Sequence, residues 1–121
     1  MSTVKVNDLQ NNSGGIPTVK GQRLIPTAWV NFSGTAATIR DSENVSSITD
    51  LGSSDFTVNF TVAMANSNYA VIEGTGYANA GNHRTGNPYS FTATGFRTGS
   101  TYADGSMQDV TYNSYTVMGG Q

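Results

Sequence analysis

Few side chains in this chain of 121 residues could perform acid–base or nucleophilic chemistry. His83 is the only histidine, and a Ser-His-Asp arrangement would need a carboxylate to orient it and an activated serine beside it. It lies instead in a segment rich in Gly and Asn. Cysteine is absent, which excludes disulfides, thiolate nucleophiles and cysteine-based zinc sites. We therefore interpret His83 as a loop residue without a catalytic role.

Two pairs of acidic residues are close in sequence, Asp41 with Glu43 and Asp50 with Asp55. Glycoside cleavage needs two carboxyl groups about 5 to 9.5 Å apart. Each pair flanks an expected turn, where Asp commonly caps the backbone, so we interpret these acids as structural. Loop carboxylates can also bind calcium, and Asp41, Glu43 and Asp50 are the remaining candidates for such a site. We expect no enzymatic activity, no metal and no cofactor.

The segment from Gly76 to Tyr89 is the strongest candidate for a binding site, because long loops in compact domains are often functional. Its tyrosines could offer flat faces to a sugar ring, and its polar groups could bind hydroxyls. The loop from Arg97 to Ser106 would lie beside it if strands at 89–96 and 110–118 pair. Alternatively, the two tyrosines only bound strands and the loop is inert. The predicted glycan-binding residues are Tyr77, Asn79, Asn82, His83, Arg84, Asn87, Tyr89 and Tyr102.

Composition narrows the class of protein. Ser, Thr, Asn and Gly make up 55 of the 121 residues, and only 12% are charged, against about 25% in an ordinary soluble domain. Eight acidic and six basic residues give a net charge of -2, so the basic surplus of a nucleic-acid binder is missing. No stretch approaches the roughly 20 apolar residues of a membrane helix. We expect neither nucleic-acid binding nor membrane insertion.

The elements that must position these residues are short strands. The clearest run is 55–62, in which every second residue is apolar, as in a strand with one buried face: Phe56, Val58, Phe60 and Val62. Weaker runs predict strands at 28–32, 37–40, 45–49, 68–76, 89–96 and 110–118. Turn-forming clusters separate them at 50–54, 65–68, 97–100 and 103–106, and Asp104-Gly105 predicts a hairpin. The fold class is therefore all-β.

We expect a single antiparallel β-sandwich, jelly-roll-like, over residues 28–121, with an extended N-terminal arm over residues 1–27. Val4, Val6 and Leu9 are candidate docking residues of that arm, or belong to a first strand of the same sandwich. Trp29 and Phe32 fall on opposite faces of one strand. We assign Trp29 to the core, although an outward residue at this strand could instead pack between subunits.

One part of the chain resembles a known family. The run Ala28-Trp29-Val30-Asn31-Phe32-Ser33-Gly34-Thr35, followed by 38–42, 44–50, 55–60 and Asn68-Tyr69-Ala70-Val71, resembles a module of tail-fibre proteins of tailed bacteriophages, typical of phages that infect cyanobacteria. The opening residues 4–11 resemble segments that precede this module. Residues 72–121 hardly match it.

This resemblance implies a non-enzymatic virion protein on the particle exterior, commonly a homotrimer. The favoured function is a short tail fibre or tail-tip component that recognises a host surface glycan and docks to other phage structural proteins through its arm. The alternative is a capsid decoration protein, whose arm and trimer interface would clamp neighbouring capsid subunits. A small carbohydrate-active enzyme is the least favoured interpretation.

Overall fold

The computed structural model describes residues 2–15, 17–20, 22–23, 25–76 and 84–120. Within these residues the chain forms strands and no helix, and so no helix that could cross a membrane. The strands are β1 (Thr18–Val19), β2 (Gln22–Arg23), β3 (Ala28–Ser33), β4 (Thr38–Glu43), β5 (Val45–Gly52), β6 (Asp55–Phe60), β7 (Tyr69–Gly76), β8 (Thr85–Thr92), β9 (Gly95–Thr101) and β10 (Tyr112–Gly119).

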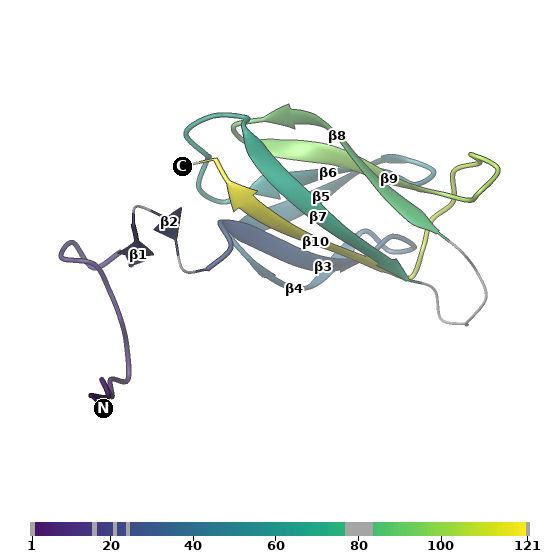
Figure 1. Cartoon of the computed structure of the whole chain (residues 1–121). Coiled ribbons are helices and arrows are strands. Elements are labelled where there is room, and N and C mark those ends of the chain that lie inside the picture. The colour runs from purple at the N-terminus through teal and green to yellow at the C-terminus, as the bar shows by residue number, and fades with distance from the viewer. Residues whose placement is uncertain (1, 16, 21, 24, 77–83, 121) are drawn as a thin grey trace.

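Eight of these strands form two antiparallel sheets of four strands each (Figure 1). The β3 sheet has the strand order β4-β3-β10-β7, and the β6 sheet has the order β5-β6-β9-β8. The predicted all-β sandwich is therefore confirmed. Its strand number is that of a jelly roll, and among the described strands β3–β4, β5–β6 and β8–β9 are hairpins within one sheet.

The strands before β3 belong to neither sheet. β1 pairs only with β2, with Thr18 opposite Arg23 and Val19 opposite Gln22. Residues 2–15 contain no strand, and the side chains of Val4, Val6 and Leu9 are exposed. The described residues before β3 therefore contribute no strand to either of the two four-stranded sheets.

The core lies between the two sheets and is built from alternate residues of their strands. β6 shows the pattern most clearly, because its apolar residues are buried while its polar residues are only partly covered. Aromatic rings connect the sheets: the Phe32 and Phe56 ring centroids are 5.3 Å apart, and those of Phe96 and Tyr115 are 5.7 Å apart. The twelve buried residues of this core are Ala28, Val30, Phe32, Val45, Phe56, Val58, Phe60, Met64, Tyr69, Phe96, Tyr115 and Val117.

The buried phenol of Tyr115 makes stability sensitive to alkaline pH. Its hydroxyl accepts a hydrogen bond from Thr98 Oγ1 at 2.6 Å, and desolvation raises the pKa of Tyr115 to about 12. The unfolded chain releases this proton near pH 10, whereas the folded protein holds it. The contribution is therefore fully present below pH 10 and is lost as pH rises towards 12. Urea unfolding from pH 8 to 12 should show a smaller alkaline loss for Tyr115→Phe; an equal loss would contradict this assignment.

The structure corrects the prediction for residues 84–101. We expected one strand at 89–96 and a turn at 97–100, but the residues form β8 and β9 with the turn at Ala93–Thr94. Proline and glycine in this region suggested a loop, yet Pro88 is tolerated because β8 is an edge strand. The condition that strands at 89–96 and 110–118 pair is not met, since β8 and β9 belong to one sheet and β10 to the other.

Three further predictions are wrong, two of them about single residues. Phe32 is buried in the core, and Trp29 lies on the outer face of the β3 sheet, opposite Glu43 and Thr116, where it is only partly covered. Val62 is 68% exposed because β6 ends at Phe60, so the period-two pattern outlasts the strand by two residues. The expected hairpin at Asp104-Gly105 is a turn between strands of different sheets.

Candidate functional site

The sandwich has two different ends. We call the end that contains Thr27, Asn44, residues 61–65 and Gly120 the arm end, because the N-terminal segment joins the sandwich there (Figure 1). The opposite end contains the turn after β3, the turn after β5 and the connection from β9 to β10, and we call it the loop end. Gly34 N donates to Val110 O at 2.9 Å and Ser54 N donates to Asp109 Oδ1 at 2.6 Å, which brings these three connections together.

A stacked arginine and tyrosine lie at the loop end. The Arg84 guanidinium carbon is 3.2 Å from the centroid of the Tyr102 ring, and its Nη2 donates to Gln108 Oε1 at 2.7 Å. Arg84 is only 8% exposed, and Tyr102 is partly exposed. The arginine therefore joins the start of β8 to the β9–β10 connection and holds one face of the tyrosine.

The β9–β10 connection has its own hydrogen bonds. Tyr102 N donates to Ser106 O and Gly105 N donates to Tyr102 O, both at 2.9 Å. Gly105 has a φ of 85°, which a glycine adopts easily. Asp104 Oδ1 accepts from the backbone N and the hydroxyl of Ser106, and these bonds hold the pKa of Asp104 below its usual value. The turn that presents Tyr102 is thus ordered by its own residues.

Beneath this turn lies a buried polar network that ties both sheets to it. Ser54, with 0% exposure, accepts a hydrogen bond at Oγ from Ser100 N at 2.6 Å. Ser100 Oγ donates to Asn113 Oδ1 at 3.0 Å, and Asn113 Nδ2 donates to Val110 O at 3.3 Å. Buried polar groups with satisfied partners fix a single arrangement, so the network positions the loop end against the core.

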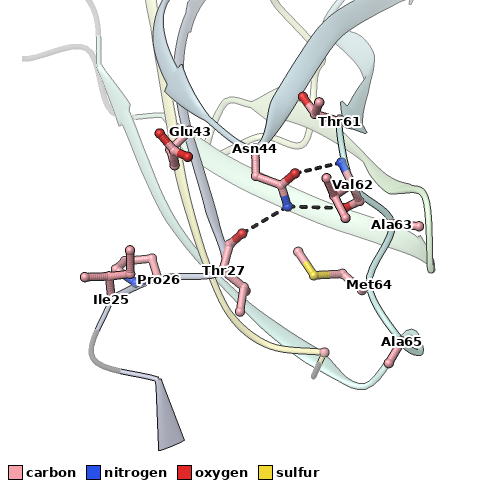
Figure 2. Close-up of a pocket in the computed structure, with 11 residues that line it drawn as sticks. Ile25, Pro26, Thr27, Glu43, Asn44, Thr61, Val62, Ala63, Met64 and Ala65 are labelled. Carbon is pink, nitrogen blue, oxygen red and sulfur yellow. Dashed lines mark hydrogen bonds between the residues drawn. The ribbon is translucent and has the colours of Figure 1, made fainter. Parts of the chain in front are cut away.

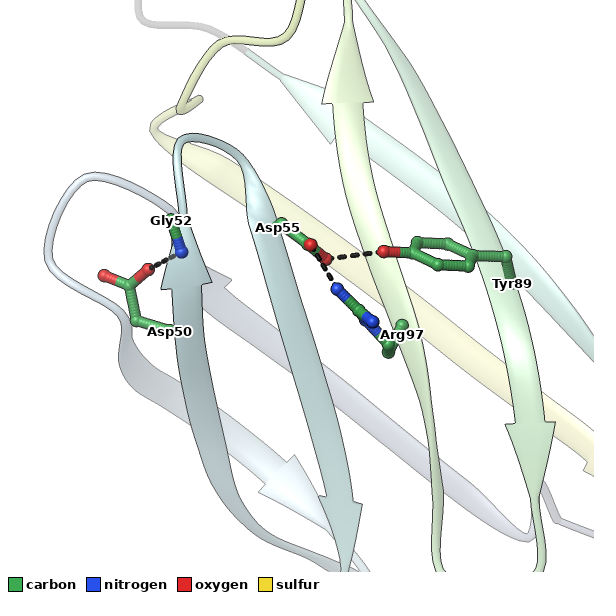
Figure 3. Close-up of polar contacts among 5 residues, drawn as sticks. All are labelled: Asp50, Gly52, Asp55, Tyr89 and Arg97. Atoms are coloured by element: carbon green, nitrogen blue, oxygen red, sulfur yellow. Dashed lines mark hydrogen bonds and ion pairs between the residues drawn. The ribbon is translucent and has the colours of Figure 1, made fainter.

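A second polar cluster crosses the outer face of the β6 sheet (Figure 3). Asp55 on β6 forms an ion pair with Arg97 on β9 and accepts a hydrogen bond from the Tyr89 hydroxyl on β8 at 2.7 Å. The Tyr89 hydrogen bond, together with Arg97, holds the pKa of Asp55 below its usual value. The Arg97 guanidinium carbon lies 5.2 Å from the Tyr89 ring centroid. The three side chains bind one another across three strands.

The predicted glycan-binding residues are distributed as follows. Tyr77, Asn79, Asn82 and His83 lie outside the described residues. Arg84 and Tyr102 come together at the loop end. Asn87 is exposed on β8, two positions before Tyr89, which is part of the cluster on the β6 sheet.

The acidic residues considered for catalysis or calcium make structural contacts. Asp50 Oδ1 accepts from Gly52 N at 3.0 Å (Figure 3), and Asp41 Oδ1 accepts from Ser42 N at 2.9 Å. Asp55 is paired with Arg97. No group of three or more His or acidic side chains that could hold a metal ion occurs in the part of the chain that the structure describes.

A groove of about 750 Å³ at the arm end was not predicted from the sequence (Figure 2). It lies among residues 25–27, Glu43, Asn44, residues 61–65 and Gly120. Asn44 shapes it: its Nδ2 donates to Thr27 O at 3.1 Å and to Val62 O at 3.2 Å, while its Oδ1 accepts from Val62 N at 2.7 Å. The sequence carried one sign of this groove. The alternating apolar run continues to Val62, two residues beyond the end of β6, and so provides an apolar side chain outside the strand.

Comparisons with known proteins found no match among family models, curated proteins or solved structures. The class that the structure defines is the two-sheet antiparallel β-sandwich.

Proposed function

We propose that this chain is a virion structural protein of a tailed bacteriophage, a short homotrimeric tail fibre or tail-tip component on the particle exterior. It recognises a glycan of the host cell surface and catalyses no reaction. The observation that supports this proposal is the polarity of the sandwich. The N-terminal segment and Gly120 are at the arm end, and the hydrogen-bonded turn with Tyr102 is at the loop end (Figure 1). Such a chain can be held at one end while it presents the other.

The chemistry of the loop end suits a neutral sugar. Tyr102 offers a ring held by Arg84, and the exposed residues of its own turn, 103–106, are polar or small. Met107, which follows the turn, is 49% exposed and adds an apolar contact beside the ring. Tyrosine, serine, glycine and asparagine are favoured in binding surfaces that combine flat contact area with hydrogen bonds. The acidic side chains of the β9–β10 connection are engaged in structural contacts: Asp104 orders the turn, and Asp109 accepts from Ser54 N. These contacts favour recognition over catalysis.

Replacing Tyr102 with alanine should lower binding to a bacterial surface polysaccharide by at least about tenfold. The ring is lost as a contact, whereas the fold loses only the stacking with Arg84, about 0.5–2 kcal/mol for such a pair. Binding of the purified protein to an array of bacterial surface polysaccharides measures this. Tyr102→Phe keeps the ring and should bind within a fewfold of the unsubstituted protein. Met118→Ala, an exposed position near the arm end, is the matched control. Unchanged binding by Tyr102→Ala would remove the loop end as the contact surface.

The alternative is a capsid decoration protein, which the arm-end groove favours because a neighbouring capsid subunit could occupy it. Copy number separates the two functions. A few dozen chains or fewer per particle fit a tail fibre, and hundreds of copies on the head fit decoration.

A further inference from the structure

The groove at the arm end has an apolar lining that its own chain leaves uncovered. Val62 and Ile25, on its walls, are 68% and 47% exposed, while Met64 is 7% exposed. In Figure 2 the Met64 side chain points into the space between Thr27 and Ala65. Burying an exposed aliphatic side chain is favourable, because it removes apolar surface from water. The groove is thus suited to a segment that brings small aliphatic side chains.

The N-terminal segment has such side chains and leaves them exposed. Val4 is 83% exposed, Val6 is 58% exposed and Leu9 is 57% exposed. In an extended segment Val4 and Val6 point to the same side, so both can enter one groove. Figure 1 shows these first residues lying away from the two sheets. The segment and the groove are therefore complementary surfaces, each without a cover.

We propose that the Val4–Leu9 segment of one copy occupies the arm-end groove of a second copy, so that the segments link the subunits in a closed ring. The groove and the segment are at the same end of the molecule. When copies are related by rotation about an axis parallel to the long axis of the sandwich, their arm ends lie at the same height. The segment of each copy then lies at the height of the groove of the next copy. Contacts of this head-to-tail kind close into rings. This inference rests on the homotrimer of the proposed function and assigns the contact that builds it.

Reach and charge agree with this arrangement. Thr18, the first residue of the β1–β2 pair, follows Val6 by twelve residues, a length that spans up to about 40 Å when extended, whereas a domain of this size has a radius of gyration of about 14 Å. The groove has an acidic rim residue, Glu43, and the segment has a basic residue, Lys5. Within the described residues neither side chain has an ion-pair partner. Lys5 of one copy can therefore pair with Glu43 of the next.

Disulfide trapping tests the contact directly, because the chain has no cysteine. One chain carries Val6→Cys in the segment and Ala63→Cys in the groove, and it is oxidised under mild conditions. A disulfide needs Cα atoms about 4.4–6.8 Å apart, so only a seated segment reacts. Most of the protein should run as covalent dimers and closed trimers on a non-reducing gel, and reductant should return it to monomer. The control pair, Val6→Cys with Ser53→Cys at the loop end, should give less than a tenth as much covalent product.

Every other result overturns the inference. A disulfide within one chain, seen as a faster monomer, means that the segment fills its own groove. Free thiols in both positions mean that the segment binds another protein or nothing. Val62→Asp provides a second measurement, since Val62 is exposed in the single chain and the variant should fold. Its mass in light scattering should fall from trimer to monomer, and a trimeric Val62→Asp protein would contradict the proposal.

The two proposals fail separately in these experiments. If the protein binds polysaccharide through Tyr102 but gives no covalent trimer, the attachment function is supported and the proposed ring of subunits is contradicted. If the protein gives a covalent trimer but binds no polysaccharide, the proposed ring of subunits is supported and the attachment function is contradicted.

Discussion

Phe96→Ala should lower the free energy of unfolding by about 3–5 kcal/mol, the range for a buried phenylalanine. Phe96 is 1% exposed, and its ring centroid lies 5.7–6.4 Å from those of four other aromatic residues. These belong to both sheets, namely Phe60, Tyr69, Phe91 and Tyr115. The substitution therefore removes the centre of the aromatic core and leaves a cavity that neither sheet can close alone. Since small domains are stable by only about 5–15 kcal/mol, the variant should be marginal.

Phe91→Ala is the matched control, because it removes the same ring from the edge of the same cluster. Phe91 lies on the edge strand β8 and is 39% exposed, so its removal should cost about 1–2 kcal/mol. Urea unfolding followed by tyrosine and tryptophan fluorescence measures both variants. Equal losses for Phe91→Ala and Phe96→Ala would show that the cluster has no centre at Phe96.

Gly95→Ala should cost about 3 kcal/mol, at the upper end for adding one methyl group to a packed interior. A Cβ at Gly95 would lie 2.2 Å from the backbone oxygen of Val58, much closer than any real contact. Gly95 is paired with Asn59 on β6 and with Thr92 on β8, and its carbonyl accepts from the Tyr69 hydroxyl at 2.8 Å. The methyl group therefore cannot be admitted without moving β9 away from β6.

Gly74→Ala isolates the steric part of this prediction. Gly74 also lies in a strand, but a Cβ there would be 3.8 Å from its nearest neighbour, the Cβ of Ser114. At a position without strain, alanine restricts the unfolded chain and should stabilise the protein by about 0.4–1 kcal/mol. Thermal unfolding of both variants measures the difference in their stability. A Gly95→Ala protein as stable as Gly74→Ala would contradict the close approach of β9 to β6.

Much of the fold could be predicted from the spacing of apolar residues. β6 was recognised because Phe56, Val58 and Phe60 alternate with polar residues, and a period of two residues is that of a strand with one buried face. β9 was not recognised as a separate strand, because Gly95 was placed inside a strand at 89–96 and Gly99 in a turn at 97–100. In the structure they are strand residues that let the β9 backbone approach Val58 and Ser54, and a Cβ at Gly99 would lie 2.4 Å from Ser54 O. Only the pairing of β9 with β6 makes that requirement visible.

The candidate site was harder to predict for the same reason. Tyr102 and Arg84 were both named as binding residues, but their stacking joins two connections that are far apart in sequence. Tyr89 was expected at the border between a loop and a strand at 89–96. It lies inside β8, which begins at Thr85, because an edge strand tolerates the proline beside it. The contact of Tyr89 with Asp55 depends on the register of three strands, which no single stretch of sequence encodes.

We propose that this chain attaches a phage particle to its host, with the arm end towards the particle and the loop end outwards. Immunogold electron microscopy of purified particles, with an antibody raised against the whole chain, tests it most directly. We expect gold at the tail or tail tip, and a few dozen copies or fewer per particle by quantitative mass spectrometry. Gold spread over the head in hundreds of copies, or particles without any label, would contradict it.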